Sequence, residues 1–228
     1  IPKNIANKPE NWDHYWFSQE KTPASGLYEK IASFYRVRII RPSLNTHLKR
    51  AFLPGEQILH AGCGSGMVDT DVVTVYQITA CDFSPQALNI YSDLHGGRAK
   101  TVQADLFKTD FPDSCFDGLY NLGVMEHFLA SEIQIVLKEF HRILKPRSRI
   151  VLFWPPEFGL SVMVLKVIHF VLNDLLGRDI HLHPAEPSRV KSRDQIRELL
   201  QKNGFELEQF DFGFADLFTH AIIRAIKN

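Results

Sequence analysis

The sequence predicts a single-domain α/β protein with a mostly parallel sheet, and three observations support this prediction. The chain has 228 residues, a length that suits one α/β domain with additions better than two independent cores. From residue 57 onward, short apolar runs alternate with segments of helical periodicity, which implies right-handed βαβ units. The last two apolar runs are joined only by a loop, which cannot carry a parallel crossover and therefore implies an antiparallel hairpin.

The boundaries of the elements follow from apolar periodicity and turn residues. The predicted strands are Gln57–Ala61, Gln77–Cys81, Ala99–Ala104, Phe116–Leu122, Arg149–Trp154, Glu206–Phe212 and His220–Ile226. The predicted helices begin near Leu27 and at Pro42, cover Pro85–His95 and Ser131–Leu144, and follow Ser192, whose spacing to Gln195 matches a capping box.

Composition and charge narrow the class of protein. Lys+Arg and Asp+Glu both total 26, so the formal net charge is zero, and no basic run is present to attract nucleic acid, which is not expected as a partner. The three cysteines, Cys63, Cys81 and Cys115, are few and far apart, which favours a reducing, cytoplasmic setting. The most apolar stretch, Phe158–Leu176, contains charged residues and is too short to span a bilayer, so no membrane span is expected.

The most informative segment is Ile58–Gly66, which reads Ile-Leu-His-Ala-Gly-Cys-Gly-Ser-Gly at the end of the first predicted strand. Glycines in such a turn let the backbone approach a ligand closely. We expect a helix to follow directly, with an electropositive N-terminus that favours an anionic group. Because Met67 stands where a dinucleotide fingerprint requires glycine, the pattern departs from that of NAD enzymes.

Two carboxylates follow the next two predicted strands. Asp82 ends the second strand, where an acidic side chain can accept both hydroxyls of a ribose. Asp105 follows the third strand and is placed to accept from an exocyclic amino group, with Phe83 available to lie against a base. The alternative is that both acids are surface turn residues.

On these residues the sequence resembles class I S-adenosylmethionine-dependent methyltransferases, of the methyltransferase type 11 group that includes ubiquinone-biosynthesis enzymes. The matching segments are Ile58–Gly66, Cys81–Ser84, Ala104–Leu106, Phe116–Phe128 and Leu144–Pro146 before the fifth strand. The resemblance implies a Rossmann-like, seven-stranded mixed sheet with the last strand inserted antiparallel and helices on both faces. It also implies S-adenosylmethionine as the cofactor.

The resemblance further implies roles for individual residues. The cofactor's methionine portion would lie against the glycine turn and the end of the first strand, its ribose at Asp82, and its adenine between Phe83 and the third strand. The sulfonium would lie near the end of the fourth strand. The implied cofactor-binding residues are His60, Gly62, Cys63, Gly64, Gly66, Asp82, Phe83, Asp105, Leu106, Asn121, Leu122 and Gly123.

His60 departs from the family, which usually has an acid at this position that helps to place the cofactor's ammonium group. A neutral imidazole can accept one hydrogen bond there, whereas an imidazolium repels the ammonium. This leads to the hypothesis that cofactor affinity falls at acidic pH.

Methyl transfer requires alignment of acceptor and methyl group, and a protic acceptor can need a base. His127 and Glu126, just after the fourth strand, are the candidate catalytic residues, although His127 can equally have a structural role at a helix start. A metal site is not expected, because Gly123 stands where some related quinone methyltransferases carry a ligating Glu, and His181 and His183 fit a solvated loop better. Tyr15, Trp16 and Trp154 are the candidate acceptor-binding residues.

The expected organisation is therefore one methyltransferase domain over 1–228. It comprises an N-terminal helical cap (1–55), a cofactor-binding core (56–154), an insertion or lid (155–191) and a C-terminal helix and hairpin (192–228). The insertion can equally pack in the core or form a dimer, so the chain is expected to be a monomer or a homodimer.

The sequence thus predicts a methyltransferase that acts on a small organic acceptor, which can be apolar. Two alternatives stay open. One is a non-catalytic S-adenosylmethionine-binding module, and the other is an NAD-linked oxidoreductase, which Met67 disfavours.

Overall fold

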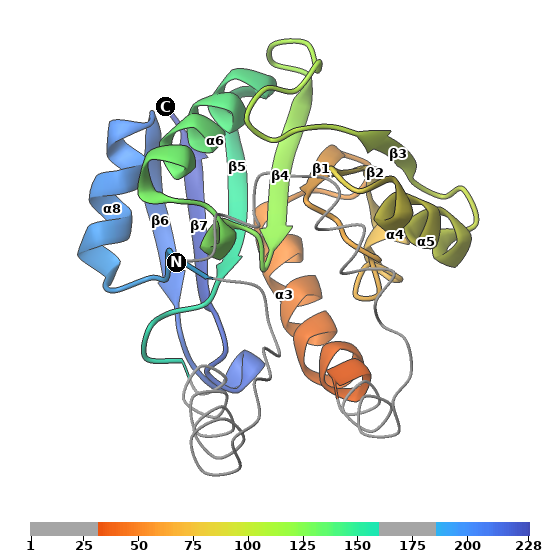
Figure 1. Cartoon of the computed structure of the whole chain (residues 1–228), viewed down its shortest axis with the longest axis horizontal. Coiled ribbons are helices and arrows are strands. Elements are labelled where there is room, and N and C mark those ends of the chain that lie inside the picture. Colours follow the sequence, from red (N-terminus) through yellow and green to blue (C-terminus); the bar gives the residue numbers. More distant parts are fainter. Residues whose placement is uncertain (1–31, 160–185) are drawn as a thin grey trace, which may run out of the picture.

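The computed structural model describes residues 32–159 and 186–228, and the fold it shows is a seven-stranded sheet between two layers of helices (Figure 1). The strand order is β3-β2-β1-β4-β5-β7-β6. The strands are β1 (Gln57–Ala61), β2 (Gln77–Asp82), β3 (Lys100–Gln103), β4 (Phe116–Leu122), β5 (Leu144–Trp154), β6 (Phe205–Asp211) and β7 (Ala221–Lys227). The predicted Rossmann-like α/β fold is confirmed.

Neighbouring strands from β3 to β5 are parallel, and β7 lies antiparallel between β5 and β6. The predicted hairpin is therefore present, and its second strand is the inserted one. Because β7 runs opposite to its neighbours, the β6–β7 connection lies at the same edge as the carboxyl ends of β1, β2, β4 and β5. This edge is called the carboxyl edge below.

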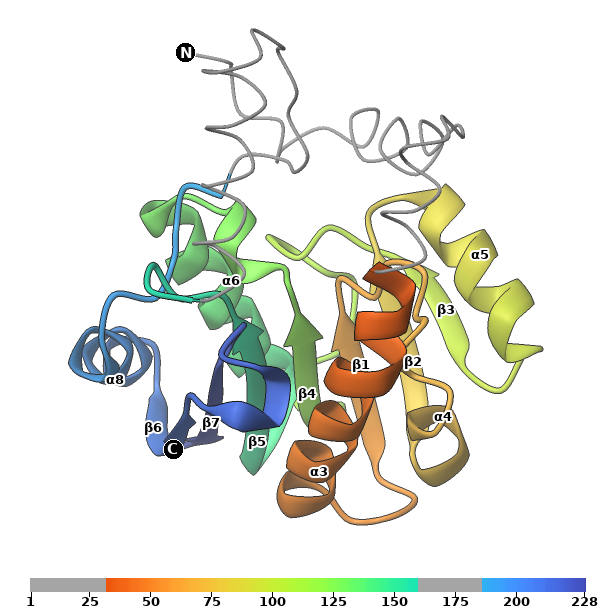
Figure 2. The same ribbon diagram turned by 90° about the horizontal axis from the view of Figure 1, so that it is seen from below.

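The helices divide between the two faces of the sheet, as the view in Figure 2 shows. One layer holds α3 (Arg41–Ala51), α4 (Val72–Val75) and α5 (Pro85–His95), and the other holds α6 (Ala130–Ile143) and α8 (Arg193–Lys202). A π-helical turn, η2 (Arg36–Ile40), precedes α3, and two 3-10 turns, η3 (Met125–His127) and η5 (Phe214–Asp216), lie in connections. Each layer covers its own apolar core.

Local sequence explains most of these elements. Four of the five β1 residues are buried, as expected for a strand covered on both faces. Ser192 caps α8 by accepting a hydrogen bond from the Gln195 amide at 3.2 Å, a contact that stabilises a helix by about 1 kcal/mol. Only half of the predicted capping box forms, because the Gln195 side chain accepts from the Lys191 amide instead.

One local prediction was wrong. The helix expected directly after the glycine turn is reduced to the single turn of α4, which begins at Val72. Three of its four residues are valines and the fourth is Thr74, and β-branched side chains lose rotamer freedom in a helix. Thr74 also donates its hydroxyl back to the carbonyl of Asp71 at 2.7 Å. A four-residue helix offers at most a weak dipole to an anion.

Other differences are shifts of boundaries. β5 begins at Leu144 rather than Arg149, with a break in its register against β4. Among the described residues, no helix is long and apolar enough to cross a membrane. The division of the chain into cap, core, insertion and tail stays a prediction.

Candidate functional site

The candidate site lies at the carboxyl edge, where β1 has β2 on one side and β4 on the other. The chain leaves β1 toward β2 and later returns on the opposite side at β4, so the connections diverge between the ends of β1 and β4. In open α/β sheets, ligands bind at this kind of switch point. The sheet brings the glycine turn, Asp82 and the residues after β4 to this place.

The glycine turn adopts a conformation that other residues rarely take. Gly62, Gly64 and Gly66 have φ angles of 71°, 51° and 63°. A Cβ on Gly62 would lie 2.7 Å from Cγ2 of Val124, and one on Gly66 would overlap the Tyr91 ring. Positive φ and these close contacts both require glycine. The turn is therefore tightly packed against Val124 and Tyr91, with glycine required at Gly62 and Gly66; it is called the glycine cradle below.

Asp82 holds this cradle to the end of β2. Its Oδ2 accepts a hydrogen bond from the Gly64 amide at 2.8 Å, and its Oδ1 accepts from the Ser84 amide at 3.0 Å. Burial raises the pKa of the carboxyl group, and the two amides oppose this rise. Each carboxylate oxygen can accept two hydrogen bonds, so each retains capacity for a ligand hydroxyl.

The residues around the third strand are less enclosed. Asp105 is exposed, and its Oδ1 accepts from the Phe107 amide at 2.9 Å, which fixes the turn after β3. Phe83 is half-buried beside Asp82, whereas the Leu106 side chain is buried in the core beneath α6. A contact between Leu106 and an adenine edge therefore requires its backbone rather than its side chain.

His60 does not face an open site. Its ring is 2% exposed, and its Nδ1 lies 2.6 Å from Oδ2 of Asp69, a residue with 0% exposure. The same oxygen accepts from the Tyr91 hydroxyl at 2.8 Å, and Tyr120 stacks on the imidazole at 4.2 Å between ring centroids. A carboxylate is therefore present behind His60, contributed by the loop after the glycine turn.

The end of β4 carries polar groups without partners. Both amide atoms of Asn121 and Oε2 of Glu126 are buried and have no hydrogen-bond partner within the described ranges. Burial, aided by nearby Glu186, raises the pKa of Glu126 to about 8, although a backbone hydrogen bond and Arg189 act in the opposite direction. Oε1 of Glu126 lies 4.0 Å from Nε2 of His127. Since buried amides are nearly always hydrogen-bonded, Asn121 indicates a ligand or water at this point.

The candidate acceptor-binding residues are only partly placed. Trp154 is 3% exposed, and its indole N–H donates to the carbonyl of Ser188 at 2.8 Å. Tyr15, Trp16, His181 and His183 lie outside the described residues. Across 32–159 and 186–228, no group of three or more His, Cys, Asp or Glu side chains is arranged to hold a metal ion.

Sequence reasoning missed three polar residues near the carboxyl edge: Asp69, Asp216 and His220. Asp69 and Asp216 are almost completely buried, at 0% and 1% exposure, and each bonds a histidine. The spacing of four between Asp216 and His220 was the available signal, but it falls in a loop where periodicity carries no information.

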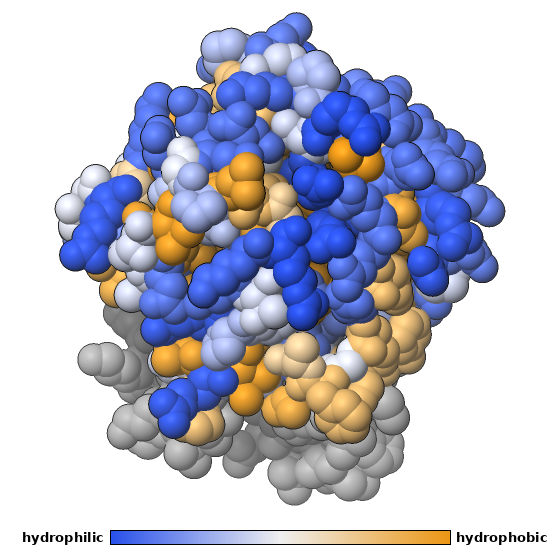
Figure 3. Space-filling model, turned by 180° about the vertical axis from the view of Figure 1, so that it is seen from behind, coloured by the Kyte–Doolittle hydropathy of each residue, from blue (hydrophilic) through white to orange (hydrophobic). Residues whose placement is uncertain are grey.

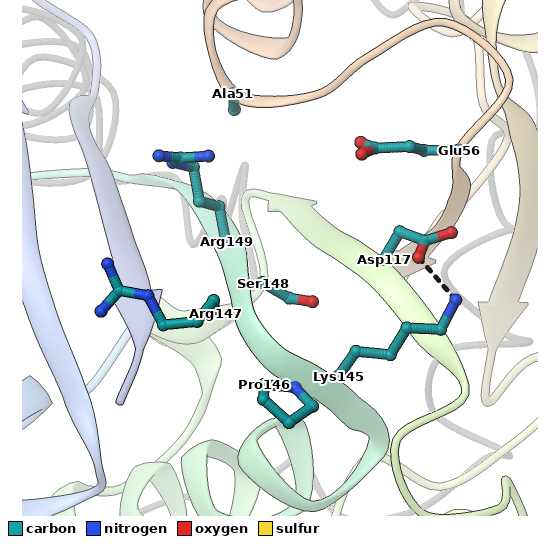
Figure 4. Close-up of a pocket in the computed structure, with 8 residues that line it drawn as sticks. All are labelled: Ala51, Glu56, Asp117, Lys145, Pro146, Arg147, Ser148 and Arg149. Carbon is teal, nitrogen blue, oxygen red and sulfur yellow. Dashed lines mark hydrogen bonds and ion pairs between the residues drawn. The ribbon is translucent and has the colours of Figure 1, made fainter.

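A polar pocket of 230 Å³ lies at the opposite edge of the sheet (Figure 4). It is lined by Ala51, Glu56, Asp117, Lys145, Pro146, Arg147, Ser148 and Arg149. Lys145 and Asp117 form an ion pair across it at 2.6 Å, and Arg149 is paired with Glu208 at 2.9 Å. The pocket lies away from the glycine turn and Asp82, so it is not the candidate site.

Comparison with known proteins agrees with this geometry. Residues 59–152 match the family model described as "Methyltransferase domain". An O-methyltransferase of Penicillium expansum is 30% identical over 105 residues, which cover 43% of this chain and 37% of that protein. A probable tRNA methyltransferase 9B of Homo sapiens is 26% identical over 64% of this chain and 32% of its own length. The chain thus spans about a third of the length of these curated relatives.

Among solved structures, the magnesium protoporphyrin IX methyltransferase of Synechocystis PCC 6803, crystallised with bound SAH, has the same fold. Its TM-score is 0.67 at 18% identity, with 96% of this chain and 95% of that chain covered. The glycine cradle, the acid at the end of β2 and the inserted antiparallel strand occur together with the matched domain. Residues 59–152 thus carry the sequence pattern of a methyltransferase domain, on a fold that is shared with an S-adenosylhomocysteine-bound methyltransferase.

Proposed function

We propose that the chain binds S-adenosylmethionine at the carboxyl edge of β1, β2 and β4 and transfers its methyl group to a small organic acceptor. The observation that carries this proposal is the cradle: Gly62 and Gly66 leave no room for a Cβ, and Asp82 fixes the turn through the Gly64 amide. The partnerless Asn121 amide at the end of β4 adds a polar group that a ligand can satisfy.

The residues fit the cofactor as follows. The turn Gly62–Gly66, with Cys63 buried beneath it, would accommodate the methionine portion, and the remaining lone pairs of Asp82 would accept the ribose hydroxyls. Phe83, Asp105 and the Leu106 backbone would border the adenine. Asn121, Leu122 and Gly123 would lie near the sulfonium. His60 would act only through Asp69, since it is buried behind the turn.

When bound, the cofactor supplies an electrophilic methyl group on a good leaving group. The work of the protein is then to align the acceptor and to exclude water. Glu126 and His127 stand on the acceptor side of β4, and with its raised pKa Glu126 is largely protonated at neutral pH. It can therefore donate a hydrogen bond to an acceptor oxygen. Trp154 would shape this region from beneath.

The class of acceptor is part of the proposal. A small molecule fits the zero net charge, because a chain without net positive charge has no overall field that attracts nucleic acid. The likeness to a tRNA methyltransferase makes RNA the alternative acceptor. Transfer of labelled methyl groups to bulk tRNA, compared with transfer to a panel of small phenols, amines and thiols, separates the two.

The ribose assignment has a direct test. Asp82→Ala should weaken binding of S-adenosylhomocysteine, measured by calorimetry, by about 1–3 kcal/mol, the scale of hydrogen bonds to a charged group. The matched control is Asp93→Ala, an exposed acid on α5, which should bind normally. Unchanged affinity in Asp82→Ala, or equal binding of NAD, would contradict the proposal. Tight binding without transfer to any acceptor would favour the non-catalytic module.

A further inference from the structure

A second histidine–aspartate pair lies at the carboxyl edge, away from the glycine turn. Oδ2 of Asp216 lies 2.9 Å from Nδ1 of His220 and accepts from the backbone N–H of the same residue at 2.8 Å. The carboxylate therefore orients the ring and favours the tautomer with its proton on Nδ1, which leaves a lone pair on Nε2. The Asp216 side chain is 1% exposed, whereas the His220 side chain retains 10% exposure.

The Nε2 atom is available in the part of the chain that the structure describes. The atom makes no hydrogen bond there, and it is not completely buried. A lone pair that is oriented, partnerless and accessible has the properties of a general base.

The loop that carries this pair is strained. Leu217 and Phe218, between Asp216 and His220, have φ angles of 55° and 58°, a region that bulky L-residues rarely adopt. Tyr35 holds the loop by donating its hydroxyl to the Asp216 carbonyl at 2.7 Å, and it also bonds the Thr219 hydroxyl. Strain that is maintained by surrounding contacts is concentrated at functional sites.

The strand register places His220 beside the proposed acceptor region. Ala221 pairs with Trp154 on β5, and the preceding β5 residue, Phe153, pairs with Leu122 on β4. His220 therefore lies just beyond the sheet, two strands from Gly123. At a strand spacing of about 4.8 Å, the two backbones are roughly 10 Å apart, with the end of β5 between them, so both face the space beyond the carboxyl edge.

Aromatic side chains border the pair. Phe218 contacts Phe212 and Phe214 at centroid distances of 5.3 and 4.7 Å, and Phe212 contacts Phe158 at 4.9 Å. Phe158 and Phe214 are 45% and 83% exposed. Figure 3 shows apolar surface along the lower edge of the coloured part of the molecule, with smaller apolar patches among the hydrophilic surface above. Such edge-to-face ring surfaces favour an aromatic ligand.

We propose that His220 is the general base of the reaction, with Asp216 as its positioning residue, and that the acceptor is a hydroxylated aromatic compound. This inference rests on the proposed methyl transfer. As the acceptor oxygen forms its bond to the methyl carbon, the carbon–sulfur bond breaks and its electron pair passes to sulfur. The hydroxyl proton moves to Nε2 of His220 and is then released to water.

Other titratable groups lie around the ring of His220. Asp216 on η5 and Tyr35, just before η2, bond the loop directly. His47 on α3 and His220 both contact the ring of Phe153, at 5.9 and 5.8 Å. His47 in turn lies 3.6 Å from Asp211 at the end of β6. The pH dependence of kcat should therefore be measured for His47→Gln as well as for His220→Gln.

The test uses the whole chain with labelled S-adenosylmethionine and the probes phenol, catechol and 2-naphthol. His220→Gln should lower kcat by about 10²–10⁴-fold, the usual contribution of a positioned base, with affinity for S-adenosylhomocysteine unchanged. Its residual rate should rise with pH as the acceptor ionises by itself, and added imidazole should restore activity to His220→Ala. Asp216→Asn should lower kcat by about tenfold or more without raising KM. The control is His141→Gln, on the helix end at the opposite edge of the sheet.

A readout independent of turnover is nitrogen NMR of the His220 ring in the complex with S-adenosylhomocysteine. We expect the Nδ1-protonated tautomer in the wild type and a mixture of tautomers in Asp216→Asn. An Nε2-protonated wild-type ring, or a His220→Gln rate within threefold of wild type, overturns the base assignment. Normal binding of S-adenosylhomocysteine without transfer to any of the three probes overturns the acceptor class. If the wild-type protein does not bind S-adenosylhomocysteine, the proposed function itself is overturned.

Discussion

Two histidine–aspartate pairs in this protein have the same chemistry and opposite surroundings. In both, one carboxylate oxygen accepts two hydrogen bonds and the other has no partner within 32–159 and 186–228. The His60–Asp69 pair is sealed, with side chains 2% and 0% exposed. The His220–Asp216 pair lies at the rim, where the imidazole is 10% exposed and Nε2 is open.

The difference teaches that pairing alone does not assign a role. A sealed pair cannot exchange protons with a substrate, so His60–Asp69 serves to hold the glycine turn against Tyr91 and Tyr120. A pair at the rim has the same orientation of the ring, but one nitrogen remains accessible. Burial, rather than residue type, separates the structural pair from the one we propose to be functional.

The largest expected effect comes from breaking the sealed pair. Asp69→Ala leaves the His60 ring and the Tyr91 hydroxyl without their acceptor in a fully buried place. We expect the free energy of unfolding to fall by about 3–5 kcal/mol, measured by denaturant titration. Asp216→Ala should cost less, about 1–3 kcal/mol, because water can reach its partner.

The exposed Asp71→Ala is the control for loss of an acid from the same loop, and its expected effect is below about 1 kcal/mol. Equal losses in Asp69→Ala and Asp216→Ala would show that the two pairs do not differ in the way we describe.

The packing above the sealed pair can be probed with two glycines of similar φ. Gly66→Ala would drive a methyl group into the Tyr91 ring, whereas Gly96, with φ of 57°, has nothing within 4 Å of the corresponding Cβ position. Both substitutions strain the backbone and should lower the free energy of unfolding by about 1–2 kcal/mol. At Gly66 the clash with Tyr91 should lower it by a further amount of about 1–3 kcal/mol. Thermal or denaturant unfolding of both variants isolates the clash, and identical stabilities would show that Tyr91 moves aside freely.

The last expected effect depends on pH and concerns Glu126, a buried acid whose Oε2 has no hydrogen-bond partner within 32–159 and 186–228. Burial raises the pKa of Glu126 from 4.5 to about 8, so the folded state favours its protonated form. Its contribution to stability is present below pH 4.5 and is lost as the pH rises through 8. Glu126→Gln cannot titrate, so wild type should lose about 2–3 kcal/mol relative to this variant between pH 5.5 and 7.5.

Denaturant titrations at several pH values measure this difference, with the exposed Glu198→Gln on α8 reporting the change due to all other groups. A constant difference between wild type and Glu126→Gln would show that Glu126 is ionised in the folded protein.

Much of the fold could be predicted because its signals are local. The boundaries of β1, β4 and α5 match the prediction residue for residue, since each is bounded by turn or capping residues. The length of the helix after the glycine turn was mispredicted. The glycine pattern indicates a helix, but the β-branched residues Val72–Val75 disfavour a long one. At the site, Gly62, Gly64, Gly66 and Asp82 are recognisable by their spacing, and the structure brings them together.

The sequence by itself determined the alternation of strands and helices, the glycine turn and the acid at the end of the second strand, because these depend on residues close together in the chain. Only the tertiary structure decided that His60 is sealed, at 2% exposure, while His220 keeps 10% of its side chain exposed. Asp69 reaches His60 across nine residues, and the β6–β7 connection reaches the proposed acceptor region only because β7 inserts beside β5. The exposure and the hydrogen-bond partners of a side chain depend on segments that are distant in the sequence, so local periodicity cannot predict them.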